Sequence, residues 1–494
     1  MLFLLWLLVL GAISYYLLQQ NISRITRTPV WLLWLVIMSP VLIWIAWLLV
    51  HGSSKTAPPE LLIVPFMVSP FLYWFLVELG RKQIQSSTVS QAAGGETEPS
   101  DEPSQPKPPL RPIDPAEEAS LRECFPWSVY FLQNLEFRPQ AVICRGHLRA
   151  NPEVAYQTIR ENVERVFGDR FLVIFQTSLS GQHFFALVPN PNRQTGDNPV
   201  KTESLTRPVF ALTLLLITIF TTTIVGSQIA GVSEKVLQSN PSMLTKGLPY
   251  ALALMAILGI HETGHYLAAV YYKIRTTLPY FVPVPFFLGT FGAFIQMRSP
   301  VPNRRALFDI SIAGPLAGLI PTVAFLIWGL YHSTIVPLSP QSGISNFKSF
   351  TPDFSLLLTL LGKLTLGGAL NTDTAINLHP VAIAGYVGLI VTAFNLMPVG
   401  QLDGGHIVHA MFGQRTSMAI GQFARLFMLL LSFLEPGLLL WAVILFLMPL
   451  NDEPALNDVS ELNDWRDFVG LAAIGLLLVI LLPAPRILVQ WLNV

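Results

Sequence analysis

Long apolar runs separated by short polar connections dominate the 494-residue sequence. A helix that crosses a bilayer needs about 20 mostly apolar residues. Runs of that length recur near residues 1–19, 29–50, 61–79, 207–230, 247–272, 306–331, 376–397, 417–449 and 468–493. Two more apolar segments, 281–297 and 355–370, are short or interrupted by Pro and Gly, which favours interfacial or re-entrant structure. We therefore predict a polytopic α-helical membrane protein with about nine spans.

Composition agrees with this pattern, since 52% of the residues are hydrophobic and only 12% are charged. These proportions exclude an ordinary soluble globular protein. Lys and Arg of the short connections fall mostly on one side if the N-terminus lies outside, so the helix at 247–272 is expected to end inside. The first run lacks a basic start and a small-residue cleavage site, and we expect no transit peptide before it. We expect a retained helix and the plasma or thylakoid membrane of a cyanobacterium.

One polar region interrupts the membrane pattern. Residues 81–112 are rich in Ser, Pro, Gly and Glu, which predicts a flexible linker. Residues 113–206 contain strand-like runs at 140–148, 170–179 and 182–189 and a helical pattern at 151–168, and predict a small α/β domain on the inner side. No catalytic cluster is evident there, and its two cysteines, Cys124 and Cys144, are expected to be reduced structural thiols.

The whole chain is thus expected to form six parts. They are three N-terminal helices (1–80), the linker (81–112), the α/β domain (113–206), a membrane core (207–450), an acidic loop (451–467) and a C-terminal helix (468–494).

The stretch LGIHETGHYLAAV, residues 258–270, places polar residues inside an apolar run. His261 and His265 are four apart and project from one helix face, with Glu262 beside them: the H-E-x-x-H arrangement that binds zinc and supplies a base. Packing of these side chains against a neighbouring helix is the alternative. That alternative is weak in hydrocarbon, where a carboxylate costs several kcal/mol. The stretch therefore predicts a zinc site.

A catalytic zinc usually has three protein ligands, so a third must come from another helix. Asp309, Asp403 and Glu435 are the candidate acids. Asp403 is favoured because Pro398 and nearby glycines break the apolar run there and because the depths match. Asp309 is expected to pair with Arg304 or Arg305, and Glu435 to lie in an outer turn. The remaining candidates, His406 and His409, compete as ligands.

HETGHY at 261–266 and NLMPVGQLDGG at 395–405 together resemble the site-2 protease family of intramembrane zinc metalloproteases. The resemblance implies that His261, His265 and Asp403 bind one Zn²⁺ per chain and that Glu262 is the catalytic base. GHLR at 146–149, GTFGAFIQMRSP at 289–300, AGPLAG at 313–318 and LNDVSELNDWR at 456–466 extend the likeness to the EGY-type branch of chloroplasts and cyanobacteria. His406 stands where the family pattern leads us to expect an arginine. The first three runs are not covered.

Two further features bear on a protease mechanism. Asn395 is expected to hydrogen-bond the oxyanion or the substrate backbone, with a helix cap as the equal alternative. Residues 290–297 are predicted to form an exposed strand of a re-entrant hairpin to which an unwound substrate adds as a further strand. The candidate substrate-binding residues are Gly289, Phe291, Gly292, Phe294 and Ile295.

The function predicted from the sequence is hydrolysis of peptide bonds in transmembrane substrates by an intramembrane zinc metalloprotease. An inactive membrane scaffold and a metal or solute transporter are the alternatives. The expected partners are transmembrane substrates and the lipid bilayer, without nucleic acid. The oligomeric state, the substrate and the cleavage position are not indicated.

Overall fold

The computed structural model describes residues 28–51, 112–138, 141–178, 181–190, 208–284, 288–339, 347–352, 355–371, 373–434 and 438–485, with single positions elsewhere. It consists of two compact units, residues 1–107 and 108–494. In the first unit, α2 (Val30–His51) is an apolar helix where the run at 29–50 was predicted. The predicted helix at 1–19 and the predicted linker lie outside the described residues, apart from Tyr15 and Pro112, and only single positions of 61–79 are described.

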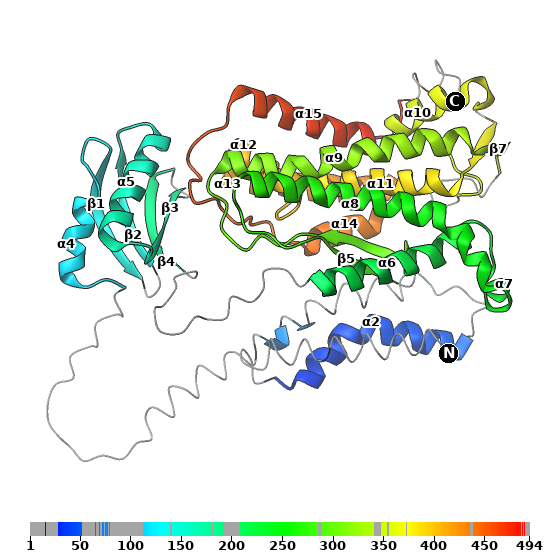
Figure 1. Ribbon diagram of the computed structural model, residues 1–494, viewed down its shortest axis with the longest axis horizontal. Helices are drawn as coiled ribbons and strands as arrows, with labels where there is room; N and C mark the ends of the chain where they lie inside the picture. Colours follow the sequence, from blue (N-terminus) through cyan, green and yellow to red (C-terminus); the bar gives the residue numbers. More distant parts are fainter. Residues whose placement is uncertain are drawn as a thin grey trace, which may run out of the picture. The chain divides into compact units, whose positions relative to one another are not determined.

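The second unit begins with a four-stranded antiparallel sheet of strand order β1-β2-β4-β3 (Figure 1). Its elements are α4 (Pro115–Glu123), β1 (Tyr130–Arg138), β2 (Ala141–Leu148), α5 (Pro152–Phe167), β3 (Phe171–Thr177) and β4 (His183–Pro189). The sequence predicted β2, α5, β3 and β4, whereas it missed α4 and β1. The register of β1 shifts between Leu132 and Asn134, which interrupts the period-two pattern of a regular strand.

Local chemistry explains where α5 starts and how it packs. The Asn151 side chain accepts a hydrogen bond from the Glu153 N–H at 2.9 Å, and Pro152 occupies the first helical position. The buried face of α5 packs into an apolar core with the sheet, where the Phe175 and Phe185 rings stack with centroids 4.1 Å apart. Both cysteines lie in this core as free, buried thiols.

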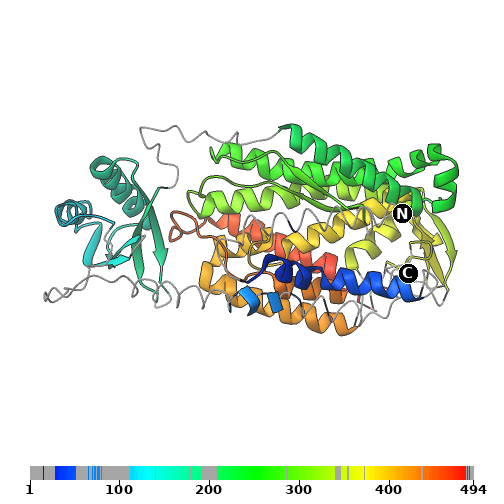
Figure 2. The same ribbon diagram turned by 90° about the horizontal axis from the view of Figure 1, so that it is seen from below.

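The remainder of the second unit is mostly helical. It comprises α6 (Pro208–Ile229), α7 (Glu234–Ser239), η1 (Pro241–Gly247), α8 (Leu248–Tyr271), β5 (Tyr280–Pro283), β6 (Thr290–Phe294), α9 (Arg304–Tyr331), β7 (Thr334–Pro337), α10 (Leu356–Leu366), η2 (Gly367–Ala369), β8 (Thr374–Asn377), α11 (Pro380–Leu396), α12 (Asp403–Phe412), α13 (Gln414–Leu434), α14 (Leu439–Leu447) and α15 (Asp464–Leu481). Helices α8, α9 and α11 pack on one another, and α6 runs beside α8 (Figures 1 and 2).

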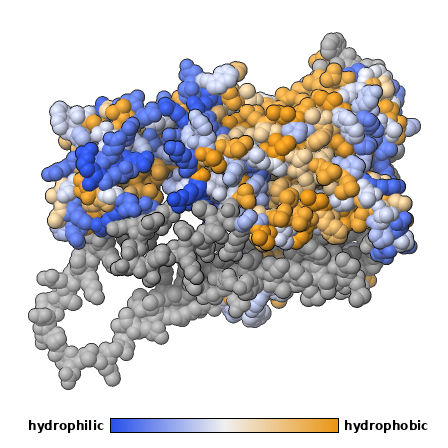
Figure 3. Space-filling view, in the orientation of Figure 1, coloured by the Kyte–Doolittle hydropathy of each residue, from blue (hydrophilic) through white to orange (hydrophobic). Residues whose placement is uncertain are grey.

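Four helical stretches among the described residues are long and apolar enough to cross a membrane. They are Pro208–Ile229, Pro241–Tyr271, Arg304–Tyr331 and Gln414–Phe433. In Figure 3, hydrophobic residues cover much of the visible surface of the helical part, whereas hydrophilic residues dominate over the sheet. An apolar exterior on helices is expected of residues that face lipid, so the chain is a membrane protein with an additional α/β region.

Two predicted segments differ from the observed elements. The run at 417–449 is two helices, α13 and α14, and not one span; Pro436, which stands between them in the sequence, cannot donate to a continuing helix. The strand predicted at 290–297 is shorter, because β6 ends at Phe294 and Met297 makes only an isolated bridge with Thr276. The segment at 355–370, which was predicted not to cross the membrane, forms the 11-residue helix α10 followed by η2.

Candidate metal and catalytic site

Helix α8 places His261 and His265 one turn apart on the same face, as their spacing predicts. Both side chains are buried, and their Nε2 atoms lie 3.2 Å apart. Glu262, between them in the sequence, is also buried, with 7% of its surface exposed. Three buried polar side chains on one turn of an apolar helix require partners from other elements.

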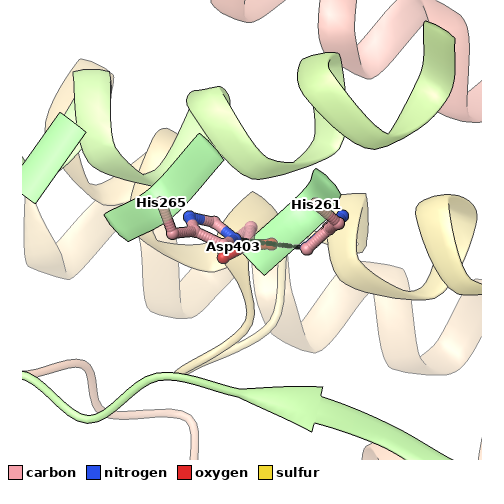
Figure 4. Close-up of side chains that lie close together, drawn as sticks. All are labelled: His261, His265 and Asp403. Carbon is pink, nitrogen blue, oxygen red and sulfur yellow. Dashed lines mark hydrogen bonds and ion pairs between the residues drawn. The ribbon is translucent and has the colours of Figure 1, made fainter. Parts of the chain in front are cut away.

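Asp403 is one of these partners and is the first residue of α12. Its Oδ2 lies 3.3 Å from His265 Nε2 and 3.5 Å from His261 Nε2. Figure 4 shows the two imidazoles and the carboxylate directed toward one another. The chain reaches this position through a turn at Gly400, which has a φ of 52° and would bring a Cβ within 1.9 Å of the Pro449 carbonyl oxygen. Only glycine satisfies both conditions.

Helix α9 contacts both histidines and fixes how their rings are oriented. His265 Nδ1 lies 2.8 Å from the Ile310 carbonyl oxygen, so Nδ1 carries the proton and donates it there, and Nε2, on the side of Asp403, keeps the lone pair that can bind a metal. Two glycines of α9 make room for the rings. A Cβ added at Gly314 would stand 2.0 Å from His265 Nε2, and one at Gly318 would stand 2.9 Å from His261 Cβ.

The three ligand atoms of His261, His265 and Asp403 lie within 4.8 Å of one another. Among the described residues, this is the one group of at least three His, Cys, Asp or Glu side chains with such spacing. Two imidazole nitrogens with one carboxylate oxygen match a donor set that zinc takes at catalytic sites, and the engaged Nδ1 of His265 is the usual outer support of such a ligand. The residues therefore fit a zinc ion.

Asn395 lies in the last turn of α11, and its Nδ2 is 3.2 Å from His261 Nε2. The cap position of α11 belongs to Met397, which disfavours the capping alternative. The side chain therefore points into the His261 region. Glu262 has the His265 ring, the Asp403 carboxylate and the backbone of Ile295 as its electrostatic neighbours. The residue that follows β6 thus reaches the candidate base.

The competing ligands lie elsewhere. His406 and His409 contact Asp452 and not the histidine pair. Asp309 was expected to pair with Arg304 or Arg305, which is wrong: it forms a two-point ion pair with Arg466 at 2.7 and 2.8 Å. The Tyr272 hydroxyl also donates to Asp309. Glu435 lies outside the described residues.

Sequence reasoning missed the part played by α9. The AGPLAG segment, residues 313–318, was noted only as a point of likeness, although small residues four apart favour close helix contact. The local sequence does not indicate which helix these small residues face. It also does not indicate the role of the Ile310 carbonyl.

Comparison with known proteins identifies the family of the chain. Residues 249–434 match the model of peptidase family M50, and residues 119–195 match that of the EGY3 middle domain. The chain is 31% identical over 406 residues to "Probable zinc metalloprotease EGY1, chloroplastic" of Arabidopsis thaliana, covering 76% of this chain and 72% of that protein. It is 28% identical over 364 residues to "Probable zinc metalloprotease EGY2, chloroplastic" of the same plant, covering 74% and 64% of the two chains. No solved structure matches it. The chain belongs to peptidase family M50, in the branch that contains the EGY proteins.

Proposed function

We propose that this protein is an intramembrane zinc metalloprotease that hydrolyses peptide bonds of transmembrane substrates in regulated intramembrane proteolysis. The observation that carries the proposal is the convergence of three ligand atoms within 4.8 Å beside the buried Glu262, in a core of apolar helices. His261, His265 and Asp403 would hold one Zn²⁺ per chain. When bound, zinc supplies a Lewis acid that polarises a peptide carbonyl and acidifies water.

The other polar groups of the site have separate tasks. Glu262 takes a proton from the attacking water and returns it to the leaving amine, which a buried carboxylate beside the ligands can do without being one. Asn395 donates from its amide to the oxyanion or to the substrate backbone, as expected of an uncharged donor already directed at His261. The Ile310 carbonyl holds the His265 ring in one tautomer.

Substrate positioning is assigned to the β5-β6 hairpin. A transmembrane helix must unwind before hydrolysis, because its carbonyls are buried in hydrogen bonds. The hairpin has two strands, so each strand leaves one edge without a strand partner among the described residues. The side chains of Phe291 and Phe294 on β6 are exposed. Ile295 is the next residue after β6, and its backbone lies beside Glu262. A substrate added as a strand, seated at Gly289, Phe291, Gly292, Phe294 and Ile295, would reach the site.

The larger architecture is proposed as follows. About nine spans cross the membrane, with the hairpin re-entrant and the α/β region on the inner side. We propose the division that the sequence predicted, with 1–80, 207–450 and 468–494 in the membrane, and 81–112, 113–206 and 451–467 outside it. The relatives are designated chloroplastic, and the thylakoid or plasma membrane of a cyanobacterium remains the location that we propose from the sequence.

The test uses the purified full chain, a transmembrane substrate and measurements of bound zinc. Glu262→Gln keeps the size of the side chain but loses its basicity, so zinc should stay at one per chain while cleavage falls at least about a hundredfold. Asp403→Ala should lose both zinc and cleavage. Glu161→Gln, an exposed glutamate of α5, is the matched control and should behave as the parent.

Each outcome separates the proposed function from an alternative. Cleavage at the parental rate by Glu262→Gln would refute the mechanism. A folded parent protein without zinc would indicate a scaffold, and metal flux into vesicles without cleavage would indicate a transporter. Natural substrates should accumulate uncut in the membrane proteome of a Glu262→Gln strain.

A further inference from the structure

The helix that carries Asp403 at its start is held at its other end by a buried ionic network. His409 of α12 is fully buried, with Nδ1 2.7 Å from Asp452 Oδ2 and Nε2 3.0 Å from Asp458 Oδ1. Both ring nitrogens must carry protons to donate to two carboxylates, so His409 is a cationic bridge between them. His406, on the same side of α12, approaches Asp452 Oδ1 at 2.8 Å, an ion-pair distance that lacks hydrogen-bond geometry.

Asp458 belongs to a short segment, Leu456–Asp458, which we call the strap. The strap forms strand-like backbone hydrogen bonds with a different segment of the chain on each of its two sides. On one side it pairs with β3: the Phe175 N–H donates to the Leu456 carbonyl at 2.7 Å, and the Asp458 N–H donates to the Phe175 carbonyl at 2.9 Å. On the other side, the strap N–H groups of residues 456 and 457 donate to the carbonyls of Val301 and Pro302, just before α9. The strap therefore joins the α/β region to the start of α9.

The Asp458 side chain links this strap to the metal-binding part. It accepts from His409 on α12 and, at 3.2 Å, from Arg304 Nε on α9. Arg304 itself lies so close to Gly413, just after α12, that a Cβ there would be 2.4 Å from Nη2. Helix α12 is thus clamped at its end by charged groups of α9 and the strap, while its first residue faces the histidine pair.

We propose that His409 is a positioning residue that holds Asp403 in place through α12, and that the strap makes this position depend on the seating of the α/β region. The inference rests on the proposed zinc site and adds to it a mechanical connection from the sheet to one ligand. His409 is not counted as a further metal ligand, since the group of described residues with ligand spacing is His261, His265 and Asp403 and does not include it. His409 does not contact Asp403 and acts on it through α12; residues that act on a site through an intervening element typically change its binding by about 2 to 30-fold when they are altered.

The test compares four full-length variants: His409→Gln, Asp458→Asn, the two combined, and Arg305→Gln. The last is the matched control, because Arg305 joins α9 to Glu153 of α5 through two hydrogen bonds without contacting α12. Zinc affinity is measured by competition with a chelator, and ligand geometry by the visible spectrum of the cobalt-substituted protein. Hydrogen exchange follows the amides of the strap and of β3.

His409→Gln and Asp458→Asn should each weaken zinc binding about 2 to 30-fold and shift the cobalt spectrum. They should also speed exchange at Phe175 and Asp458, because coupling between two sites is reciprocal. The double variant should lose less than the sum of the two, since both ends of one contact are then uncharged. Arg305 and Glu153 form an exposed ion pair, which contributes little to the seating of the α/β region, so Arg305→Gln should match the parent in every measurement.

Unchanged zinc affinity and spectrum in Asp458→Asn, with the parent binding zinc and cleaving substrate, would overturn the inference and leave the proposed function intact. Asp458→Asn keeps the shape of the side chain, so it carries the test if His409→Gln does not fold. Weaker zinc binding without faster exchange at Phe175 would refute the connection to the sheet. A parent protein that binds no zinc would instead refute the proposed function.

Discussion

The contact between Gly314 and the His265 ring offers a sharp test of how α9 supports the metal site. In Gly314→Ala, the new Cβ would lie 2.0 Å from His265 Nε2 and 2.4 Å from Cδ2. Ordinary contacts between such atoms are about 3.5 Å, so the ring must move by more than about 1 Å. It cannot do so while Nδ1 keeps its 2.8 Å contact with the Ile310 carbonyl.

The displacement can be compared with what a zinc ligand tolerates. Zinc to nitrogen bonds stay within about 0.2 Å of their normal length, so a shift of this size removes His265 from the coordination sphere. Overpacking of this kind also costs about 1–3 kcal/mol of folding stability. We expect Gly314→Ala to lose most of its zinc, measured by elemental analysis after dialysis, and to unfold at a lower temperature in detergent.

Gly475→Ala provides the control, because Gly475 lies in α15 and an added Cβ there has no neighbour within 4 Å. This change should leave zinc content unchanged and stabilise the helix by up to about 1 kcal/mol, the usual gain of alanine over glycine. Parental zinc affinity in Gly314→Ala would show that α9 does not confine the His265 ring, and the proposed role of the AGPLAG segment would be wrong.

Two further predictions concern the hairpin and the α/β region. Ile295→Pro removes the backbone N–H beside Glu262, so cleavage of helical substrates should fall at least tenfold (about 1.4 kcal/mol) while zinc is retained. The control variant, Ile295→Val, should cleave normally. Equal cleavage by both variants would count against strand addition. Burial raises the pKa of the Cys144 thiol, and burial together with the Glu123 charge raises that of Cys124 to about 11. Because thiolate is the reactive form, maleimide should label neither cysteine at pH 7 until urea unfolds the α/β region, and rapid native labelling would contradict their burial.

Much of the site could be predicted because polar groups are costly in hydrocarbon. His261, Glu262 and His265 stand out in an apolar run, and their helical spacing alone brings the imidazoles together. Asp403 could be anticipated from the Pro and Gly residues around it, since irregular backbone at membrane depth requires a cavity or a protein neighbour. These inferences need only local sequence and the properties of the bilayer.

The partners of charged loop residues could not be anticipated in the same way. Asp309 was expected to pair with a nearby arginine in sequence, but its partner is Arg466, 157 residues away. A search for the nearest opposite charge fails here, because α9 and α15 are brought together by the helices between them. The division of 417–449 into α13 and α14 was missed because apolar content alone does not show where a helix ends.

Asp403 shows that a metal ligand can be recognised from the sequence, whereas its distance from the other ligands cannot. Its chemistry is visible in one residue, but its distance from His265 depends on the turn at Gly400 and on the clamp that His409 forms at the far end of α12. An error of 1 Å in either place would remove a ligand that must lie within a few tenths of an ångström. The ligands come from two helices, α8 and α12, and α9 packs against the histidines, so the site is only as stable as the contacts that hold these three helices in position. In this chain those contacts extend, through Asp458, to a pair of backbone hydrogen bonds between the strap and β3.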